Sequence, residues 1–152
     1  MNNLKNTNLE VSSFALGCVE KVVGKTELER KYKTLVKKMS TLIQKNGYIG
    51  TLVFCYSKSQ KNKEHEEVLK NIINWHKKNY KIKNYKVKFE DENEREVRFM
   101  DINDTNFQKY IKTITKVRQN EYMLVTKEMM ILFGWMKRFA DGMIEGEDEN
   151  GD

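Results

Sequence analysis

Hydrophobic residues recur at steps of three and four along almost the whole chain, which is the pattern of helices that bury one face. The chain also contains no proline, whereas sandwiches and barrels of this size usually need proline in their turns. We therefore expect an all-α fold, a compact bundle of about six helices. The pattern places these helices at approximately residues 8–23, 26–46, 48–58, 63–80, 104–117 and 126–144.

Capping signals predict where two of these helices begin. Thr26 is followed three residues later by Glu29, which fits a capping box at the start of the second helix. Thr126 is the expected N-cap of the last helix, because Val125 and Met130 are then spaced to form a hydrophobic staple around it. Asn46-Gly47 is expected to end the second helix.

The last helix carries the longest apolar stretch, residues 129–136. This stretch is far shorter than the roughly 20 apolar residues that cross a bilayer, so we expect no membrane association. Trp135 and Phe139 lie four residues apart and close to the stripe of Leu132 and Met136. We therefore expect both aromatic side chains to be buried.

Residues 81–100 interrupt the helical pattern. Apolar residues here alternate with polar ones around Tyr85 and Val87 and again around Val97, which indicates a short β-hairpin or a mobile loop. A two-stranded hairpin on its own is marginal in water. We expect residues 1–144 to form a single helical domain from which 81–100 protrudes, followed by an acidic disordered tail over 145–152.

Charge points towards a polyanion partner. The whole chain has a net charge of +6, but five of its last eight residues are acidic. Residues 1–144 therefore hold 28 basic and 17 acidic groups, a net charge of +11. A folded body this basic suggests nucleic acid. The alternative is a lysine-rich surface that serves only solubility.

Lysines on the second helix are the main candidate RNA-backbone contacts. Because the apolar face of that helix is occupied by other residues, we expect their ammonium groups to point away from the core. Lysines outnumber arginines 23 to 5, which favours contacts to phosphates over reading of bases. The aromatic residues fall on apolar stripes, so no base-stacking platform is expected. The candidates are Lys31, Lys33, Lys37, Lys38 and Lys45, with Lys58 as a weaker one and Lys137 and Arg138 on the last helix.

No catalytic or metal site is expected. Gly24-Lys25-Thr26 resembles the end of a phosphate-binding loop, but Val19 stands where that motif needs its first glycine. His65 and His76 would lie about 16 Å apart on one helix and so cannot share a metal. We expect His76 at the edge of the core and His65 in solvent. We therefore interpret the chain as a non-enzyme without cofactors.

The two cysteines, Cys18 and Cys55, lie within apolar runs and are expected to be small buried residues. Residues 1–11 contain one lysine and no apolar run, so no signal peptide is expected. Both observations fit a reducing cytoplasmic setting.

The C-terminal run from Thr126 to Asp141 resembles the closing helix of a known family, the small subunit of the type III-B CRISPR effector, or Cmr complex. The stretch Trp135-Met136-Lys137-Arg138-Phe139-Ala140 is the most specific part. The Asn46-Gly47 turn and the apolar run after it resemble the same family. The resemblance covers roughly residues 8–76 and 101–144.

The resemblance implies a non-catalytic helical subunit. Copies of such a subunit stack along the backbone subunits that hold the crRNA and line the groove for target RNA, while other subunits cleave. The implied partners are the backbone subunit, the large subunit, further copies of itself, and the crRNA and target RNA backbones. Two alternatives stay open: the small subunit of a type III-A complex, and a helical adaptor that binds only protein.

Overall fold

The computed structural model describes residues 3–78, 84–88, 94–98 and 107–146. The fold is all-α apart from one hairpin, as expected. Five helices are present in the described ranges: α1 (Asn3–Val22), α2 (Thr26–Ser59), α3 (Lys63–Lys78), α4 (Phe107–Ile114) and α5 (Gln119–Met143). The hairpin consists of β1 (Asn84–Lys88) and β2 (Glu94–Arg98).

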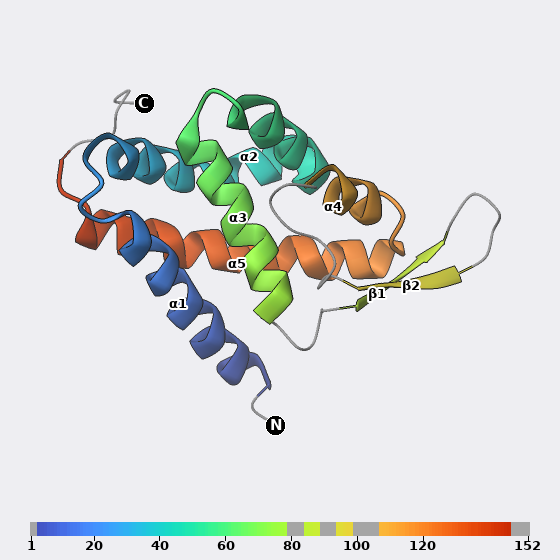
Figure 1. Ribbon diagram of the computed structural model, residues 1–152. Coiled ribbons are helices and arrows are strands. Elements are labelled where there is room, and N and C mark those ends of the chain that lie inside the picture. The colour runs from blue at the N-terminus through green and yellow to red at the C-terminus, as the bar shows by residue number, and fades with distance from the viewer. Residues whose placement is uncertain (1–2, 79–83, 89–93, 99–106, 147–152) are drawn as a thin grey trace.

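The long helix α5 spans the body of the molecule (Figure 1). Helices α1 and α2 pack against α5, and α3 and α4 pack against α2. In Figure 1, α3 crosses in front of α5, and the hairpin lies at the edge of the molecule beyond α4. The antiparallel strands pair Tyr85 with Val97, so the alternation seen in the sequence does form a hairpin. The rest of 81–100 and residues 147–152 of the predicted tail lie outside the described residues.

Helix α2 is bent sharply at Gly47, which has φ 76° and ψ 165°. Such backbone angles are accessible essentially only to glycine. The bend divides α2 into a first arm, residues 26–46, and a second arm, residues 48–59, which fold back on each other. Met39 is eight residues before the bend and Cys55 is eight residues after it. The Cys55 Sγ atom nevertheless lies 3.9 Å from the Met39 Sδ atom. The break at Asn46-Gly47 was predicted correctly. The described residues form five helices where about six were predicted, because the two arms count as the single helix α2.

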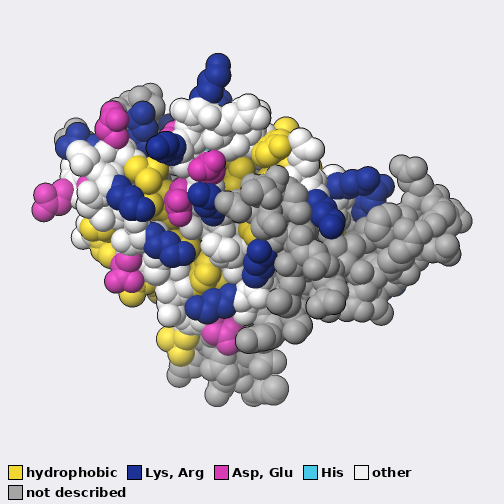
Figure 2. Space-filling model, in the orientation of Figure 1, with side chains coloured by type: hydrophobic (Ala, Val, Ile, Leu, Met, Phe, Trp, Pro, Cys, Tyr) yellow, Lys and Arg dark blue, Asp and Glu magenta, His cyan; other side chains and the backbone are white. Residues whose placement is uncertain are grey.

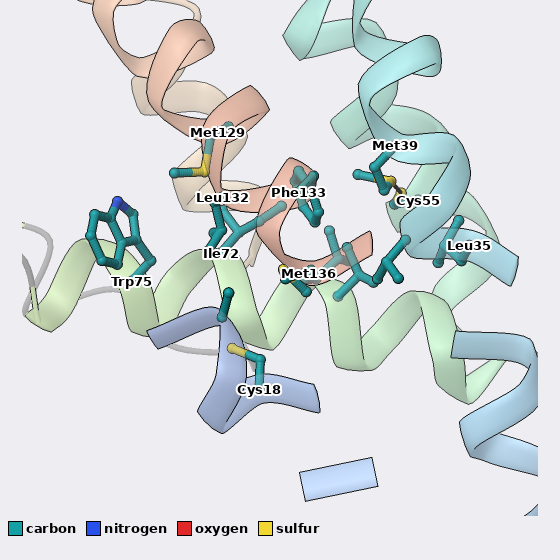
Figure 3. Close-up of a cluster of buried hydrophobic side chains, with 14 of the residues drawn as sticks. Cys18, Leu35, Met39, Cys55, Ile72, Trp75, Met129, Leu132, Phe133 and Met136 are labelled. Atoms are coloured by element: carbon teal, nitrogen blue, oxygen red, sulfur yellow. Dashed lines mark hydrogen bonds between the residues drawn. The ribbon is translucent and has the colours of Figure 1, made fainter. Parts of the chain in front are cut away.

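All five helices of the described ranges contribute buried residues to the core, and Figure 3 shows the part of it that α1, α2, α3 and α5 form. Leu132, Phe133 and Met136 of α5 lie at its centre, between residues of α1, α2 and α3. Cys18 and Cys55 are buried and unbridged, as the sequence indicated. Burial raises the pKa of both thiols to about 12, so neither is a thiolate near neutral pH.

Several polar side chains in the core form hydrogen bonds with one another. The hydroxyl groups of Tyr48 and Tyr110 lie 2.7 Å apart, and Tyr110 Oη lies 2.8 Å from Nε2 of His76. All three side chains are fully buried, so His76 belongs to the core interior and not to its edge. Tyr32 similarly donates a hydrogen bond of 2.6 Å to Oδ1 of Asn71. These bonds join α2, α3 and α4.

The predicted start of the last helix was wrong. Helix α5 begins at Gln119, and Thr126 lies inside it, donating a hydrogen bond of 2.8 Å to the carbonyl oxygen of Tyr122. A tertiary contact stabilises the extra turns, because the Tyr122 hydroxyl accepts a hydrogen bond of 3.1 Å from the N–H of Ile49. Local capping signals carry no information about such a contact.

The capping box at α2 is also different from the prediction. The helix starts at Thr26, but its N-cap is Lys25, and no side-chain hydrogen bond caps the helix there. Glu29 does reach back, and its Oε1 atom accepts a hydrogen bond of 3.2 Å from the N–H of Gly24. Glu29 therefore stabilises the turn between α1 and α2 without Thr26.

Candidate nucleic-acid interface

Basic side chains are widely distributed on the molecule. Figure 2 shows dark blue Lys and Arg side chains spread over one face, with acidic side chains between some of them. Charge alone therefore does not define a binding site. A candidate site also needs a concave surface that several of the basic residues line together. The predicted candidates differ in this respect, because the fold brings three of them together and separates the other five.

A groove of about 620 Å³ gathers Lys31, Lys38 and Lys58. Lys31 and Lys38 come from the first arm of α2, two turns apart, and Lys58 comes from the second arm. The bend at Gly47 returns the second arm alongside the first, which places Lys58 at the same groove as residues far earlier in the chain. The start of α3 completes the lining. The full lining is Lys31, Thr34, Leu35, Lys38, Leu42, Phe54, Lys58, Asn62, Glu64 and His65.

Phe54 lies among these lysines with 39% of its surface exposed. The Nζ atom of Lys58 lies over its ring at 5.7 Å from the centroid, and the His65 ring meets it edge-on at 5.7 Å. Phe54 was not among the predicted site residues, because all of those are Lys or Arg and no base-stacking platform was expected. The helical positions of buried Leu52 and Cys55 leave Phe54 on another face, and that spacing is the signal that indicates its exposure.

The groove is positively charged. Glu64 is buried, and its Oε2 atom lies 3.1 Å from Nδ1 of His65. Burial lowers the pKa of His65, although Glu64 opposes this shift, so the imidazole is neutral near pH 7. Three ammonium groups therefore face one carboxylate. His65 is half-buried rather than solvated, which corrects the expectation for that residue.

Lys33 is not a surface residue, contrary to prediction. It is only 7% exposed, and its Nζ atom donates hydrogen bonds of 3.0 Å and 2.9 Å to the carbonyl oxygens of Ile144 and Gly146. The side of α2 that carries Lys33 packs against the end of α5. The long side chain of a lysine crosses this packed face and ends at backbone carbonyl groups.

The remaining four candidates lie outside the groove. Lys37 is paired with Asp141 of α5, with 3.0 Å between Nζ and Oδ1. Lys45, Lys137 and Arg138 are exposed, but none of them lines the groove. Lys33 and Lys37 are therefore used in contacts between α2 and α5 or the residues just after it, and neither candidate on α5 lines the groove.

Residues 7–143 match the family model described as CRISPR-associated protein (Cas_Cmr5). The match covers nearly the whole of the chain. The chain belongs to the Cas_Cmr5 family. It is therefore a subunit of a CRISPR Cmr complex, and the resemblance drawn from its closing helix is confirmed. The match also extends through the hairpin region, which the resemblance itself did not cover.

Residues 135–140, which carry the most specific part of the resemblance, place two stacked aromatic rings on α5 of this Cas_Cmr5 chain. The rings of Trp135 and Phe139 stack with 5.9 Å between centroids, and the Arg138 guanidinium lies 4.8 Å from the Trp135 centroid. Both aromatic residues pack against the core but are only partly buried, so the prediction that they are buried was only partly right. The centre of the stripe is taken by Leu132, Phe133 and Met136, which leaves Trp135 and Phe139 at its margin.

Within the described ranges of this Cas_Cmr5 protein, no three His, Cys, Asp or Glu residues are grouped so that they could hold a metal ion. Of the helices in these ranges, none combines the length and the apolar character needed to cross a membrane.

Proposed function

We propose that this Cas_Cmr5 chain is the non-catalytic small subunit of a type III-B ribonucleoprotein. Copies of the chain stack along the backbone that holds the crRNA, and each copy adds lysines to the path of the target RNA. The family membership supports the assembly with other Cmr subunits. The additional observation is the groove that Lys31, Lys38 and Lys58 share.

The groove favours contacts to phosphates. Lysine ammonium groups act as point charges and bind phosphate oxygens without reading sequence. Three of them within one concave surface can follow a single strand over several phosphates. Each copy neutralises few charges, so we expect a lone subunit to bind RNA weakly. Neighbouring copies in the assembly then add their contacts through effective concentration.

The test replaces Lys31, Lys38 and Lys58 with Gln in the assembled Cmr complex. A matched control replaces Lys109, Lys112 and Lys127, three exposed lysines outside the groove. Retention of target RNA is measured against salt concentration. We expect the groove variant to lose affinity for every target sequence, with a log–log salt slope reduced by about 0.7 for each phosphate contact removed. Equal retention by the groove variant and the control would contradict the proposal.

An adaptor role without RNA contact is the alternative, and the exposed apolar side chains Met123, Leu124 and Ile131 of α5 favour it. Such residues are typical of surfaces that contact other proteins. If the chain is only an adaptor, replacing Leu124 with Gln weakens its incorporation into the complex, while the three groove substitutions leave target-RNA retention unchanged at all salt concentrations.

A further inference from the structure

The groove contains features that contacts to a phosphate backbone do not require. It has an exposed aromatic ring, polar acceptors on one side and the volume of a small-molecule site. We propose that this groove is a pocket for one unpaired RNA nucleotide, whose base stacks on Phe54 while the adjoining phosphates contact Lys31, Lys38 and Lys58. The inference rests on the proposed function, because it assumes RNA contact, and it specifies which form of RNA is bound.

Phe54 supplies the stacking surface. The residue is 39% exposed, and it lies in a groove that three lysines also line. The Lys58 ammonium group, 5.7 Å from the ring centroid, already brings a positive charge to this ring. An aromatic ring beside a cation is the combination that single-stranded nucleic-acid sites use, with bases on the ring and phosphates on the cation.

The size and chemistry of the groove favour a single unpaired nucleotide. Its volume of about 620 Å³ is within the range of about 300–1,000 Å³ that small-molecule sites occupy. A duplex keeps its bases stacked inside and offers only phosphates and groove edges, so Phe54 would meet no base face there. An unpaired nucleotide exposes both its base and its backbone.

Two acceptors line the same groove. The amide nitrogen of Asn62 donates a hydrogen bond of 3.1 Å to the carbonyl oxygen of Lys58, which fixes the orientation of the side chain and leaves its oxygen as an acceptor. The Glu64 carboxylate is held beside His65. These oxygens suit the amino and imino hydrogens of a base, while three lysines keep the groove positive for its phosphates.

The test uses the full-length chain and fluorescence anisotropy at about 50 mM salt, where phosphate contacts are strong. The probes are a short oligouridylate, a short oligoadenylate and a blunt RNA duplex. Phe54→Leu keeps the apolar volume and removes the aromatic face. We expect it to weaken single-strand binding roughly 5- to 100-fold, the range for loss of one base stack. The salt slope and duplex binding should not change.

Two further variants make the comparison specific. Phe54→Trp restores an aromatic face and should restore single-strand affinity. Val53→Ala changes the exposed neighbour of Phe54 on the same arm and should have no effect. Ultraviolet crosslinking of the bound oligouridylate, followed by mass spectrometry, should place the crosslink in the peptide that contains Phe54.

The outcomes separate this inference from the proposed function. If Phe54→Leu binds single strands as the wild type does, while substitution of Lys31, Lys38 and Lys58 weakens both single strands and duplex, the groove contacts only backbone and the inference fails. The proposed function then stands. If the wild-type chain binds no single-stranded probe, or binds the duplex better, the inference also fails, and target-RNA retention by the assembled complex judges the proposed function separately.

Discussion

The Nζ atom of Lys33 donates a hydrogen bond of 3.0 Å to the carbonyl oxygen of Ile144, the C-cap of α5. A second bond of 2.9 Å goes to the carbonyl oxygen of Gly146. The last carbonyl groups of a helix have no partners within the helix, and a positive charge next to them is favourable. Lys33 therefore joins the first arm of α2 to the end of the chain's last helix, and its role is structural.

Replacing Lys33 with Met should lower the free energy of unfolding by about 1.5–3 kcal/mol, the range for hydrogen bonds from a charged group. The methionine fills the same space but leaves two carbonyl groups unpaired. Urea denaturation measures the change. Lys45→Met, at an exposed lysine of the same arm, is the control and should stay within about 0.5 kcal/mol of the wild type. Equal values for the two variants would mean that the Lys33 bonds are not formed in solution.

Phe133 and Phe139 of α5 should respond differently to truncation. Phe133 is fully buried between helices, whereas Phe139 is partly exposed beside Trp135. Phe133→Ala should therefore cost about 3–5 kcal/mol, and Phe139→Ala about half as much. Thermal or urea denaturation of both variants checks the order. A larger loss for Phe139 would mean that α5 is rotated about its axis relative to this packing.

The sequence was sufficient for the helices and for most of the core, because burial of one face imposes a periodic pattern. Residues whose role depends on a distant partner were not predictable. Lys33 has the same local pattern as Lys37, and only the packing of α5 separates them. Lys31, Lys38 and Lys58 were named as candidates, but their meeting in one groove depends on the direction of the chain after Gly47. Phe54 was not predicted, because all of the candidates were Lys or Arg and the aromatic residues were expected to lie on apolar stripes.

Stability should fall in acid through His76. Burial lowers its pKa from 6.5 to about 3, so it stays neutral in the folded protein while it becomes protonated in the unfolded chain below about pH 6.5. The unfolded state then binds more protons, and stability decreases as pH falls from 6.5 to about 3, by up to roughly 5 kcal/mol.

The measurement compares the wild type with His76→Gln, whose side-chain amide can still contact the Tyr110 hydroxyl. Urea denaturation at several pH values gives the stability of each protein. Because both proteins have the same carboxylates, the contribution of these groups cancels in the difference between the two stabilities. As the pH drops from 6.5, the wild type should lose more stability than the variant does, because only the wild type has a histidine at position 76. A difference that is constant with pH would contradict a neutral buried His76.

The purified chain should not cleave RNA or DNA with any added divalent metal ion. Neither buried thiol is a nucleophile near neutral pH, because burial raises both pKa values to about 12, and His76 is enclosed in the core. The assay incubates labelled RNA and DNA with repurified protein. Cleavage that persists through repurification and is lost in His65→Ala or His76→Ala would overturn this prediction.

Replacing Gly47 with Ala should destabilise the protein by about 1–3 kcal/mol, because an alanine at φ 76° and ψ 165° is strained. Gly134→Ala is the control. That glycine lies within α5, and a Cβ atom there would meet nothing within 4 Å. Alanine favours a helix over glycine by about 1 kcal/mol, so the control should be neutral or stabilising. Calorimetric melting temperatures of both variants test the contrast.

Because of the bend at Gly47, a single continuous segment of the chain lines the whole groove. All of its lining lies between Lys31 and His65, so its walls meet through contacts that are close in sequence. Such contacts close smaller loops than the contacts with α5 do, so we expect them to form early in folding. A contiguous site of this kind can also be inherited or exchanged as a single segment of the chain.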